Sequence, residues 1–355
     1  MKKIKVSIVG VGNCASAIVQ GVHYYKDKEA SDSIGLTAYE LGGYEPGDIE
    51  FVSAFDVDKN KVGEDLSQAI FRPPNNTHKI TDVPHIGVNI QKGSVLDGIG
   101  KYVTQTVKTD NEQPKNIARS IQDSGAEIVL SYLPVGSTAA TKFYAEQSLR
   151  AGAAFINAMP VFIASDSYWQ KKFTDAKLPV AGDDVMSQLG ATVLHKTLVK
   201  LCVDRGVKVD ETYQLNIGGD TDFLNMQEES RLADKRVSKT SAVKAMTPYE
   251  VPTRIGPSDF VKFLDNDKVC YIYLKGKYFG NTPVLIDVKL HVVDAFNSAG
   301  VMIDAIRGTK MALERGISGP LESISAYCFK HPPIQMSYHD AKQAFLKFVD
   351  GKNER

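Results

Sequence analysis

The sequence predicts an α/β protein built on a doubly wound parallel sheet, with an α+β region inserted into it. A strand-like run at 4–9 is followed at once by glycines and then by a helical pattern. Further apolar runs alternate with helical stretches up to about residue 181. Beyond Gly182, longer strands follow, with no helix between the last two. Alternating strands and helices are typical of a parallel sheet that is covered on both faces.

The N-terminal half supplies the expected parallel strands. Residues 4–9 (IKVSIV) are apolar and β-branched, and apolar residues recur at helical spacing between 15 and 22. Residues 27–48 are polar and glycine-rich, so we interpret them as an inserted loop. A second strand covers 49–55 and ends at Asp56. Later strand candidates lie at 127–133, 154–157 and 179–181.

The C-terminal half predicts a different arrangement. Residues 188–203 look like one helix, and a helical pattern returns at 298–315. Between these helices the sequence contains long strands with alternating or strongly apolar character, at 213–217, 269–274 and 284–293. Such successive strands favour a largely antiparallel or mixed sheet.

Charge and hydropathy argue against several kinds of partner. Lys plus Arg (42) equals Asp plus Glu (42), so no overall field attracts nucleic acid or an anionic membrane. No apolar run reaches the ~18 residues of a membrane helix, and the first residues lack the apolar core of a signal peptide. The 4 cysteines are far apart and form no CxxC pair, which argues against a zinc site or a disulfide framework. We therefore expect a cytoplasmic protein with no nucleic-acid or membrane partner.

A glycine motif joins the first strand to the first helix. Gly10-x-Gly12-x-x-Ala15 has the spacing of a Rossmann dinucleotide site, in which the first glycine permits a tight turn. Gly12 would let the backbone approach a pyrophosphate, and Ala15 would allow close helix packing. Asp56, at the end of the second strand, fits the acid that binds the adenosine ribose and favours NAD over NADP. Alternatively, Asp56 and Asp58 only begin a solvated turn.

Several motifs resemble the inositol-phosphate synthase family in its shorter prokaryotic form, over essentially the whole chain. They include Gly10-Val11-Gly12-Asn13-Cys14-Ala15-Ser16, Phe55-Asp56-Val57-Asp58, Lys61-Val62-Gly63-Glu64-Asp65-Leu66, Ser131-Tyr132-Leu133-Pro134-Val135-Gly136-Ser137, Asn157-Ala158-Met159-Pro160, Gly182-Asp183-Asp184, Ser187-Gln188, Asp222-Phe223-Leu224-Asn225, Ser238-Lys239-Thr240, Gly256-Pro257-Ser258-Asp259, Asn297-Ser298-Ala299-Gly300 and Pro332-Pro333.

The resemblance implies an NAD-dependent isomerase that converts glucose 6-phosphate to inositol 3-phosphate. Family members oxidise C5, form an enol, join C6 to C1 by an aldol step and reduce C5 again, so tightly bound NAD is recycled. The resemblance also implies a homotetramer. We expect a Rossmann part formed by 1–188 with 298–355, and an inserted catalytic and oligomerisation part formed by 189–297.

The resemblance further implies a set of site residues. The four lysines are carried over as catalytic groups, with Lys235 transferring the proton at the C5 oxygen, Lys239 holding the same region, and Lys268 and Lys330 stabilising charge at the C1 end. The matching acids are Asp184, Asp222 and Asp294. Substrate contacts are expected from Asn216, Lys239, Lys268 and Lys330. Cofactor contacts are expected from Gly10, Gly12, Asn13, Cys14, Ala15, Asp56, Asp65, Leu133, Pro134, Tyr144, Asp184, Ser187, Asp222 and Lys235.

Each of these assignments has a structural alternative. Lys235 and Lys239 are four residues apart, like any pair on an exposed helical face. Asp294 could cap the helix that follows it, and Tyr144 could belong to the core. His195 lies in an apolar helical run, where a packed, hydrogen-bonded histidine is expected rather than a ligand. No motif for a metal ion is present, although a metal ion that assists catalysis is possible in the family.

Two positions depart from the family pattern. Met186 stands where a lysine is common, and Asp220 stands where asparagine is common. Together they make the site more negative by up to two charges. The open alternatives are therefore a related NAD-dependent sugar-phosphate dehydrogenase with net redox turnover, or a non-catalytic NAD-binding regulator.

Overall fold

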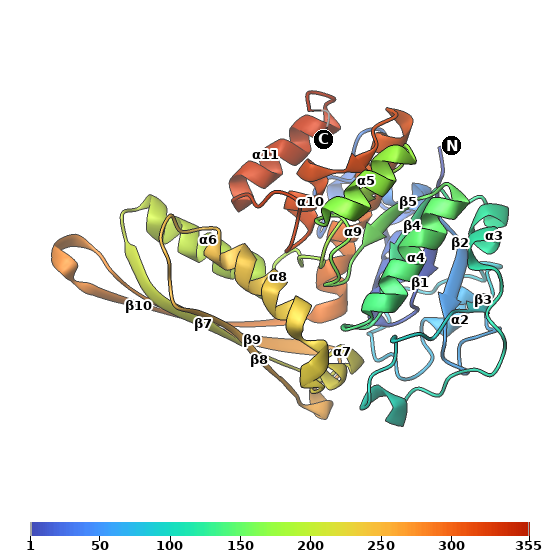
Figure 1. The fold of residues 1–355 in the computed structure, drawn as a ribbon, viewed down its shortest axis with the longest axis horizontal. Helices are drawn as coiled ribbons and strands as arrows, with labels where there is room; N and C mark the ends of the chain where they lie inside the picture. Colours follow the sequence, from blue (N-terminus) through green and yellow to red (C-terminus); the bar gives the residue numbers. More distant parts are fainter. Residues whose placement is uncertain (1, 354) are drawn as a thin grey trace.

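In this computed structural model, which describes residues 2–353 and 355, two β-sheets organise the chain (Figure 1). The larger sheet has the strand order β11-β6-β5-β4-β1-β2-β3, and its pairings are all parallel. The predicted doubly wound parallel sheet is therefore confirmed. Its strands are β1 (Ile4–Val9), β2 (Ile49–Asp56), β3 (Ile90–Lys92), β4 (Ile128–Ser131), β5 (Ala154–Asn157), β6 (Pro179–Ala181) and β11 (Gly319–Pro320).

Helices cover this sheet on both faces, which gives this part of the molecule two apolar cores, one on each side. α9 packs across β1, β4, β5 and β6 beside α1, whereas α3, α4 and α5 contact the sheet from the other side. The helices of this part are α1 (Asn13–Tyr25), α2 (Leu66–Ala69), α3 (Ile117–Ser124), α4 (Thr138–Ala151), α5 (Ser167–Asp175), α9 (Asp294–Glu314), α10 (Glu322–Cys328) and α11 (Tyr338–Val349).

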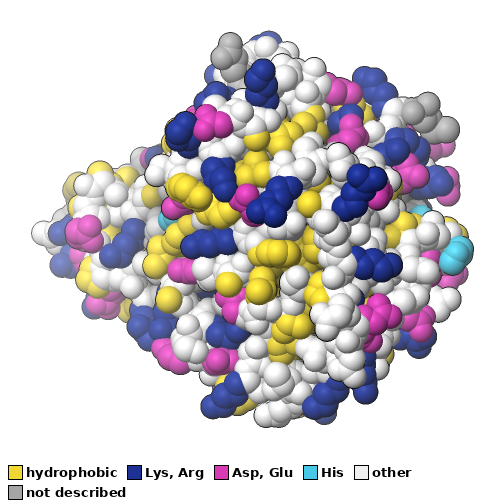
Figure 2. Space-filling model, turned by 45° about the vertical axis from the view of Figure 1, so that its right-hand side comes forward, with side chains coloured by type: hydrophobic (Ala, Val, Ile, Leu, Met, Phe, Trp, Pro, Cys, Tyr) yellow, Lys and Arg dark blue, Asp and Glu magenta, His cyan; other side chains and the backbone are white. Residues whose placement is uncertain are grey.

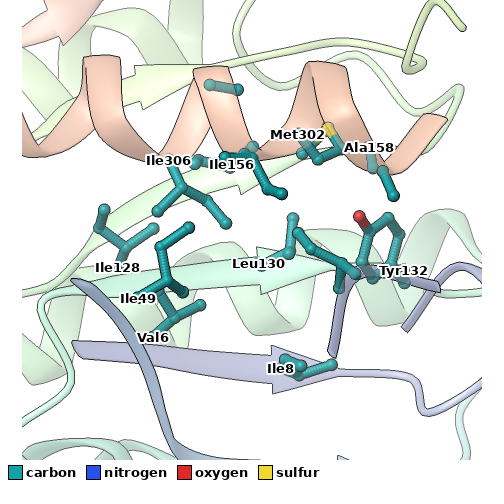
Figure 3. Close-up of a cluster of buried hydrophobic side chains, with 14 of the residues drawn as sticks. Val6, Ile8, Ile49, Ile128, Leu130, Tyr132, Ile156, Ala158, Met302 and Ile306 are labelled. Carbon is teal, nitrogen blue, oxygen red and sulfur yellow. The ribbon is translucent and has the colours of Figure 1, made fainter. Parts of the chain in front are cut away.

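In the core beneath α9, side chains of the central strands pack against that helix. Figure 3 shows Ile156 next to Met302 and Ile306 of α9, with Leu130 and then Ile8 on the two successive strands beyond it, all in one cluster. All five side chains are completely buried. Burying one such side chain contributes about 1.5–3 kcal/mol, so these contacts fix the carboxyl ends of the strands, where the candidate site lies.

The second sheet has four strands in the order β10-β9-β7-β8. The β7–β8 pairing is parallel and the other two are antiparallel, so the sheet is mixed, one of the two predicted arrangements. Its strands are β7 (Lys208–Gly218), β8 (Thr253–Phe260), β9 (Asp267–Lys277) and β10 (Pro283–Val293), and its helices are α6 (Ala191–Asp204), α7 (Thr221–Asn225) and α8 (Ala233–Lys244).

Helices α6 and α8 run along one face of this sheet and leave the opposite face open (Figure 1). The burial of β7 and β9 alternates accordingly, because successive side chains of a strand point to opposite faces. On the open face, Tyr213 and Tyr271 are each 39% exposed and Leu285 is 58% exposed. Together these side chains leave an apolar surface exposed on this face of the sheet.

Several elements differ from the sequence prediction. The strands β3, β8 and β11 were not predicted, and α6 begins at Ala191 rather than at 188. α9 begins at Asp294 rather than at 298, directly after β10.

Acidic and basic side chains are interspersed on the face in Figure 2. Among the described residues, no helix is long and apolar enough to cross a membrane.

Candidate active site

A cleft opens at the carboxyl ends of the central parallel strands, where the inserted part meets the larger sheet. This is the expected ligand position for an open parallel sheet. The cleft brings together nearly all of the sequence-predicted site residues from distant parts of the chain. Its lining includes Gly10, Gly12, Asn13, Cys14, Asp56, Leu133, Pro134, Tyr144, Asp184, Ser187, Asn216, Asp222, Lys235, Lys239, Lys268, Asp294 and Lys330.

The glycine turn has two positions with different requirements. Gly10 has φ +90°, and a Cβ there would lie 2.6 Å from the Tyr132 carbonyl oxygen, so only glycine fits. At Gly12 a Cβ would meet nothing within 4 Å. Gly12 therefore borders open space at the N-terminus of α1, where an anionic group can approach the backbone. Ala15 is completely buried and does not line the cleft. It is therefore a correction to the predicted cofactor contacts, and it has the packing role that the motif also predicted.

Asp56 ties the glycine turn to the end of β2. Its Oδ2 accepts a hydrogen bond from the Val11 amide at 2.7 Å, and its Oδ1 accepts from the Val57 and Asp58 amides. A carboxylate offers about four acceptor sites, so Asp56 retains capacity for one more hydrogen bond while it lines the cleft. Asp58 is 1% exposed, so these acids do not simply begin a solvated turn.

Lys61 is a cleft residue that the sequence did not single out. Its Nζ donates to the Val11 carbonyl oxygen at 2.8 Å and to Asn75 Oδ1 at 2.9 Å, and the residue is 4% exposed. A buried ammonium thus lies beside the glycine turn. The available signal was its place in the Lys61–Leu66 family motif.

Three lysine–carboxylate pairs form the polar end of the cleft. Lys235 Nζ donates to Asp222 Oδ2 at 2.7 Å. Lys268 Nζ donates to both oxygens of Asp294, at 3.0 and 3.3 Å. Lys330 Nζ donates to Asp184 Oδ1 at 2.9 Å. The lysines are therefore not on an exposed helical face, and Asp294 serves as an ion-pair partner.

Asp184 is held in place by its backbone as well as by its side chain. It has φ +62°, a conformation that non-glycine residues rarely adopt. Its amide donates to the Met159 carbonyl oxygen, and its own carbonyl oxygen accepts from the Lys330 amide. Ser238 donates a hydrogen bond to Asp184 Oδ2, so α8 is linked to the same carboxylate. The strained position is thus fixed by three separate segments.

Comparison with known proteins identifies the family. A family model described as myo-inositol-1-phosphate synthase matches residues 190–295. The chain is 49% identical over 357 residues to the inositol-3-phosphate synthase of Mycolicibacterium smegmatis, with 98% of each chain covered. It is 47% identical over 355 residues to that of Corynebacterium glutamicum, again with 98% of each covered. The chain belongs to the myo-inositol-1-phosphate synthase family.

A solved member of this fold supports the architecture. The crystal structure of a myo-inositol-1-phosphate synthase-related protein from Thermotoga maritima superposes with a TM-score of 0.82. The match covers 98% of both chains at 23% sequence identity. At this identity the likeness shows the shared fold, so the chemistry has to be argued from the side chains.

Lys239 differs from the other three lysines of the family set. It is buried, and no side-chain carboxylate bonds to its Nζ among residues 2–353 and 355. Burial, reinforced by repulsion from Lys235, Lys268 and Lys330, holds the pKa of Lys239 well below its usual value. Burial also lowers the pKa of Lys330, but its bond to Asp184 keeps a negative charge beside that ammonium.

Lys235 has the opposite environment. Burial alone would lower its pKa, but attraction to Asp222 and Asp184 raises the pKa of Lys235 to about 12. Lys235 is therefore a permanent cation near neutral pH and is poorly suited to accept a proton. This charge state argues against the proton-transfer role that the resemblance assigned to Lys235.

The two departures from the family pattern have unequal consequences. Burial, followed by repulsion from Asp222 and Asp294, raises the pKa of Asp220 to about 7. Asp220 therefore adds less than one negative charge near neutral pH. Met186 is 3% exposed and lies outside the lining of the cleft. The site therefore carries fewer extra negative charges than the two that the sequence predicted.

Asp65 is a correction to the predicted cofactor set. It does not line the cleft. Its side chain caps α2 through Ser67 and accepts from the amides of Ile86, Gly87 and Val88. These hydrogen bonds lower the pKa of Asp65 even though burial alone would raise it. The residue has a structural role that fixes the 86–88 segment.

Tyr144 combines both predicted possibilities, since it is buried and its ring lines the cleft. Its hydroxyl accepts from the Ser94 amide at 3.3 Å.

His195 is packed and hydrogen-bonded, as predicted, and burial lowers its pKa to about 4. Within the described part of the chain, no group of three or more His, Cys, Asp or Glu side chains is arranged to hold a metal ion.

Proposed function

We propose that this protein is an inositol-3-phosphate synthase that converts D-glucose 6-phosphate to 1D-myo-inositol 3-phosphate with recycled NAD. The observation that carries this proposal is the single cleft, in which a dinucleotide-type glycine turn faces three lysine–carboxylate pairs and Lys239. Curated relatives with 47–49% identity carry the same name.

The chain's own residues fit NAD. The open space at Gly12 and the N-terminus of α1 suit a pyrophosphate, and the ammonium of Lys61 lies beside the same turn. The remaining acceptor site of Asp56 suits a ribose hydroxyl. When bound, NAD would accept hydride from C5 of the sugar and return it there.

The lysines divide the remaining work by their charge. Lys239, whose pKa burial holds well below its usual value, is the lysine that accepts the proton of the C5 hydroxyl. Lys235 keeps a fixed positive charge beside it and stabilises the enolate oxygen. Lys268 and Lys330 are held by Asp294 and Asp184, so they offer oriented donors to the C1 oxygen and to the phosphate.

The open face of the second sheet supports a homotetramer. Tyr213 stacks on Tyr273 with ring centroids 4.9 Å apart, and Tyr271 and Leu285 extend the same apolar surface. Exposed apolar surfaces of this kind mark association sites. We propose that sheets of neighbouring subunits pack through this face.

The activity is tested by incubating the protein with glucose 6-phosphate and NAD. We expect inositol phosphate, identified by phosphorus NMR and mass spectrometry, with no net NADH absorbance. NADH that accumulates in proportion to the sugar consumed would establish the dehydrogenase alternative instead. A protein that binds NAD but forms no product would support the regulator.

A further inference from the structure

A chain of hydrogen-bonded side chains leads from α6 through β7 to the wall of the cleft. His195 Nε2 lies 2.7 Å from Thr212 Oγ1, which donates to the Tyr273 carbonyl oxygen at 2.6 Å. His195 Nδ1 lies 3.3 Å from Gln214 Oε1, and Gln214 Nε2 donates to Asn216 Oδ1 at 3.0 Å. His195, Thr212, Gln214 and Asn216 are each no more than 4% exposed.

At the cleft, the last side chain of this hydrogen-bonded series has a polar atom without a partner. Asn216 Nδ2, the amide atom that is not bonded to Gln214, has no partner among the described residues, although Asn216 lines the cleft. A buried polar atom without a partner costs about 1–3 kcal/mol. Such an atom at the wall of a cleft indicates that a ligand completes its hydrogen bond.

The hydroxyl proton of Thr212 decides the direction of every bond in the chain. Thr212 has one proton, and the 2.6 Å separation from the Tyr273 carbonyl places it there, since two bare acceptors would repel at this distance. His195 Nε2 must then donate to Thr212 Oγ1. A neutral imidazole with a proton on Nε2 has an acceptor at Nδ1.

The two amides must follow the imidazole. In the structure, Gln214 Oε1 faces His195 Nδ1 and Gln214 Nε2 faces Asn216, so this tautomer requires a half-turn of both amide groups. The Gln214 nitrogen then donates to His195 Nδ1, and the Gln214 carbonyl oxygen faces Asn216. Asn216 then donates its amide N–H to Gln214, and its carbonyl oxygen becomes the unpartnered atom at the cleft. This agrees with the general pattern that buried carbonyl oxygens are left unsatisfied more readily than N–H donors.

We propose that His195 is a positioning residue, which through Gln214 sets the Asn216 carbonyl oxygen to accept a hydrogen bond from a substrate hydroxyl. The inference rests on the proposed function, because that function supplies a polyhydroxylated substrate. The opposite arrangement, with the proton on His195 Nδ1, would present an amide donor to the cleft. The tautomer of His195 thus decides whether Asn216 presents a hydrogen-bond acceptor or a donor to the substrate.

The kinetic test compares two replacements of His195. His195→Phe keeps a ring but cannot accept from Gln214, so KM for glucose 6-phosphate should rise about tenfold while the dissociation constant of NAD stays unchanged. His195→Asn keeps an acceptor near the position of Nδ1 and should restore KM to within about threefold. An unchanged KM in His195→Phe would overturn the proposal.

Two controls separate positioning from stability. Val199→Ala removes a buried side chain one turn along the same face of α6, so it should lower stability without changing KM. Combining His195→Phe with Asn216→Ala should be no worse than Asn216→Ala alone, because the two residues act through one chain. Additive effects would contradict the inference.

The tautomer itself is measured independently of turnover. Solid-state nitrogen NMR of histidine-labelled protein, with His195→Asn to assign the signal, should show the proton on Nε2. A proton on Nδ1 would overturn the proposed orientation of Asn216. If wild type makes no inositol phosphate, the proposed function fails, while the NMR result still tests the hydrogen-bond chain.

Discussion

Lys239 shows how its neighbours set the chemistry of one residue. Three other lysines crowd it within a buried site, and each of these has a carboxylate partner. Lys239 is therefore the member of the set whose proton is most easily lost. Its sequence spacing from Lys235 is that of an ordinary helical pair, so this difference arises only in the folded protein.

Replacing Lys239 with arginine tests this charge state. Arginine stays protonated, so Lys239→Arg should reduce turnover by about 10²-fold or more while NAD still binds. In wild type, turnover should fall as the pH drops through the lowered pKa of Lys239, since the base becomes protonated. Lys275→Arg, on the exposed end of β9, is the matched control. Near-normal turnover in Lys239→Arg would assign the proton transfer to another group.

At the scale of elements, the β1–α1 turn contains two glycines that can be separated by experiment. Gly12→Ala should fold normally, since Gly12 has φ −92° and a Cβ there meets no atom within 4 Å. The same Cβ would occupy the space beside a pyrophosphate, so NAD affinity should fall more than about tenfold. Isothermal titration calorimetry measures this, and unaltered affinity would place the pyrophosphate elsewhere.

Gly10→Ala is the contrasting variant. Its φ of +90° and the clash with Tyr132 should cost at least about 1 kcal/mol of folding free energy. Thermal unfolding should therefore distinguish the two variants before any ligand is added.

The start of α7 gives a prediction on pH. Asp220 caps this helix, and an asparagine would cap it equally well. The pKa of Asp220 is about 7 in the folded protein and 3.8 in the unfolded chain. The protonated carboxyl therefore contributes its full share of folding stability below pH 3.8, and this contribution is lost as the pH rises through about 7. Asp220→Asn should therefore gain stability relative to wild type between pH 5 and 8, on the order of 2 kcal/mol. Urea denaturation at both pH values measures the difference, and an equal gain at each would contradict the assigned pKa.

At the scale of the whole molecule, the open face of the second sheet predicts the assembly. Tyr213→Lys would place a charge in the proposed contact and should convert the tetramer to smaller species in sedimentation experiments. Tyr168→Lys changes an exposed tyrosine of α5 and should leave the assembly intact. A tetramer that survives Tyr213→Lys would move the interface away from this face.

The sequence predicted what depends on local pattern. The parallel strands, the glycine turn and Ala15 follow from hydrophobic periodicity and from one short motif, and the site membership followed from family motifs. Asp65 was misassigned because a motif does not show whether a carboxylate faces a cleft or caps a helix. The contacts of Lys61, the lowered pKa of Lys239 and the raised pKa of Asp220 depend on groups that are distant in the chain, so only the assembled fold could show them.

The pairing of Lys268 with Asp294 has a consequence for how such enzymes diverge. The Lys330–Asp184 pair lies outside the segment 190–293, and the Lys235–Asp222 pair lies within it, so each of these pairs stays complete when that segment is exchanged. Lys268 lies on β9 within this segment, whereas Asp294 begins α9 directly after it. A chimaera that takes 190–293 from a relative would still need the host's acid to complete that pair. Exchange of this segment therefore preserves the Lys268–Asp294 pair only when the donor supplies the lysine and the host supplies the acid.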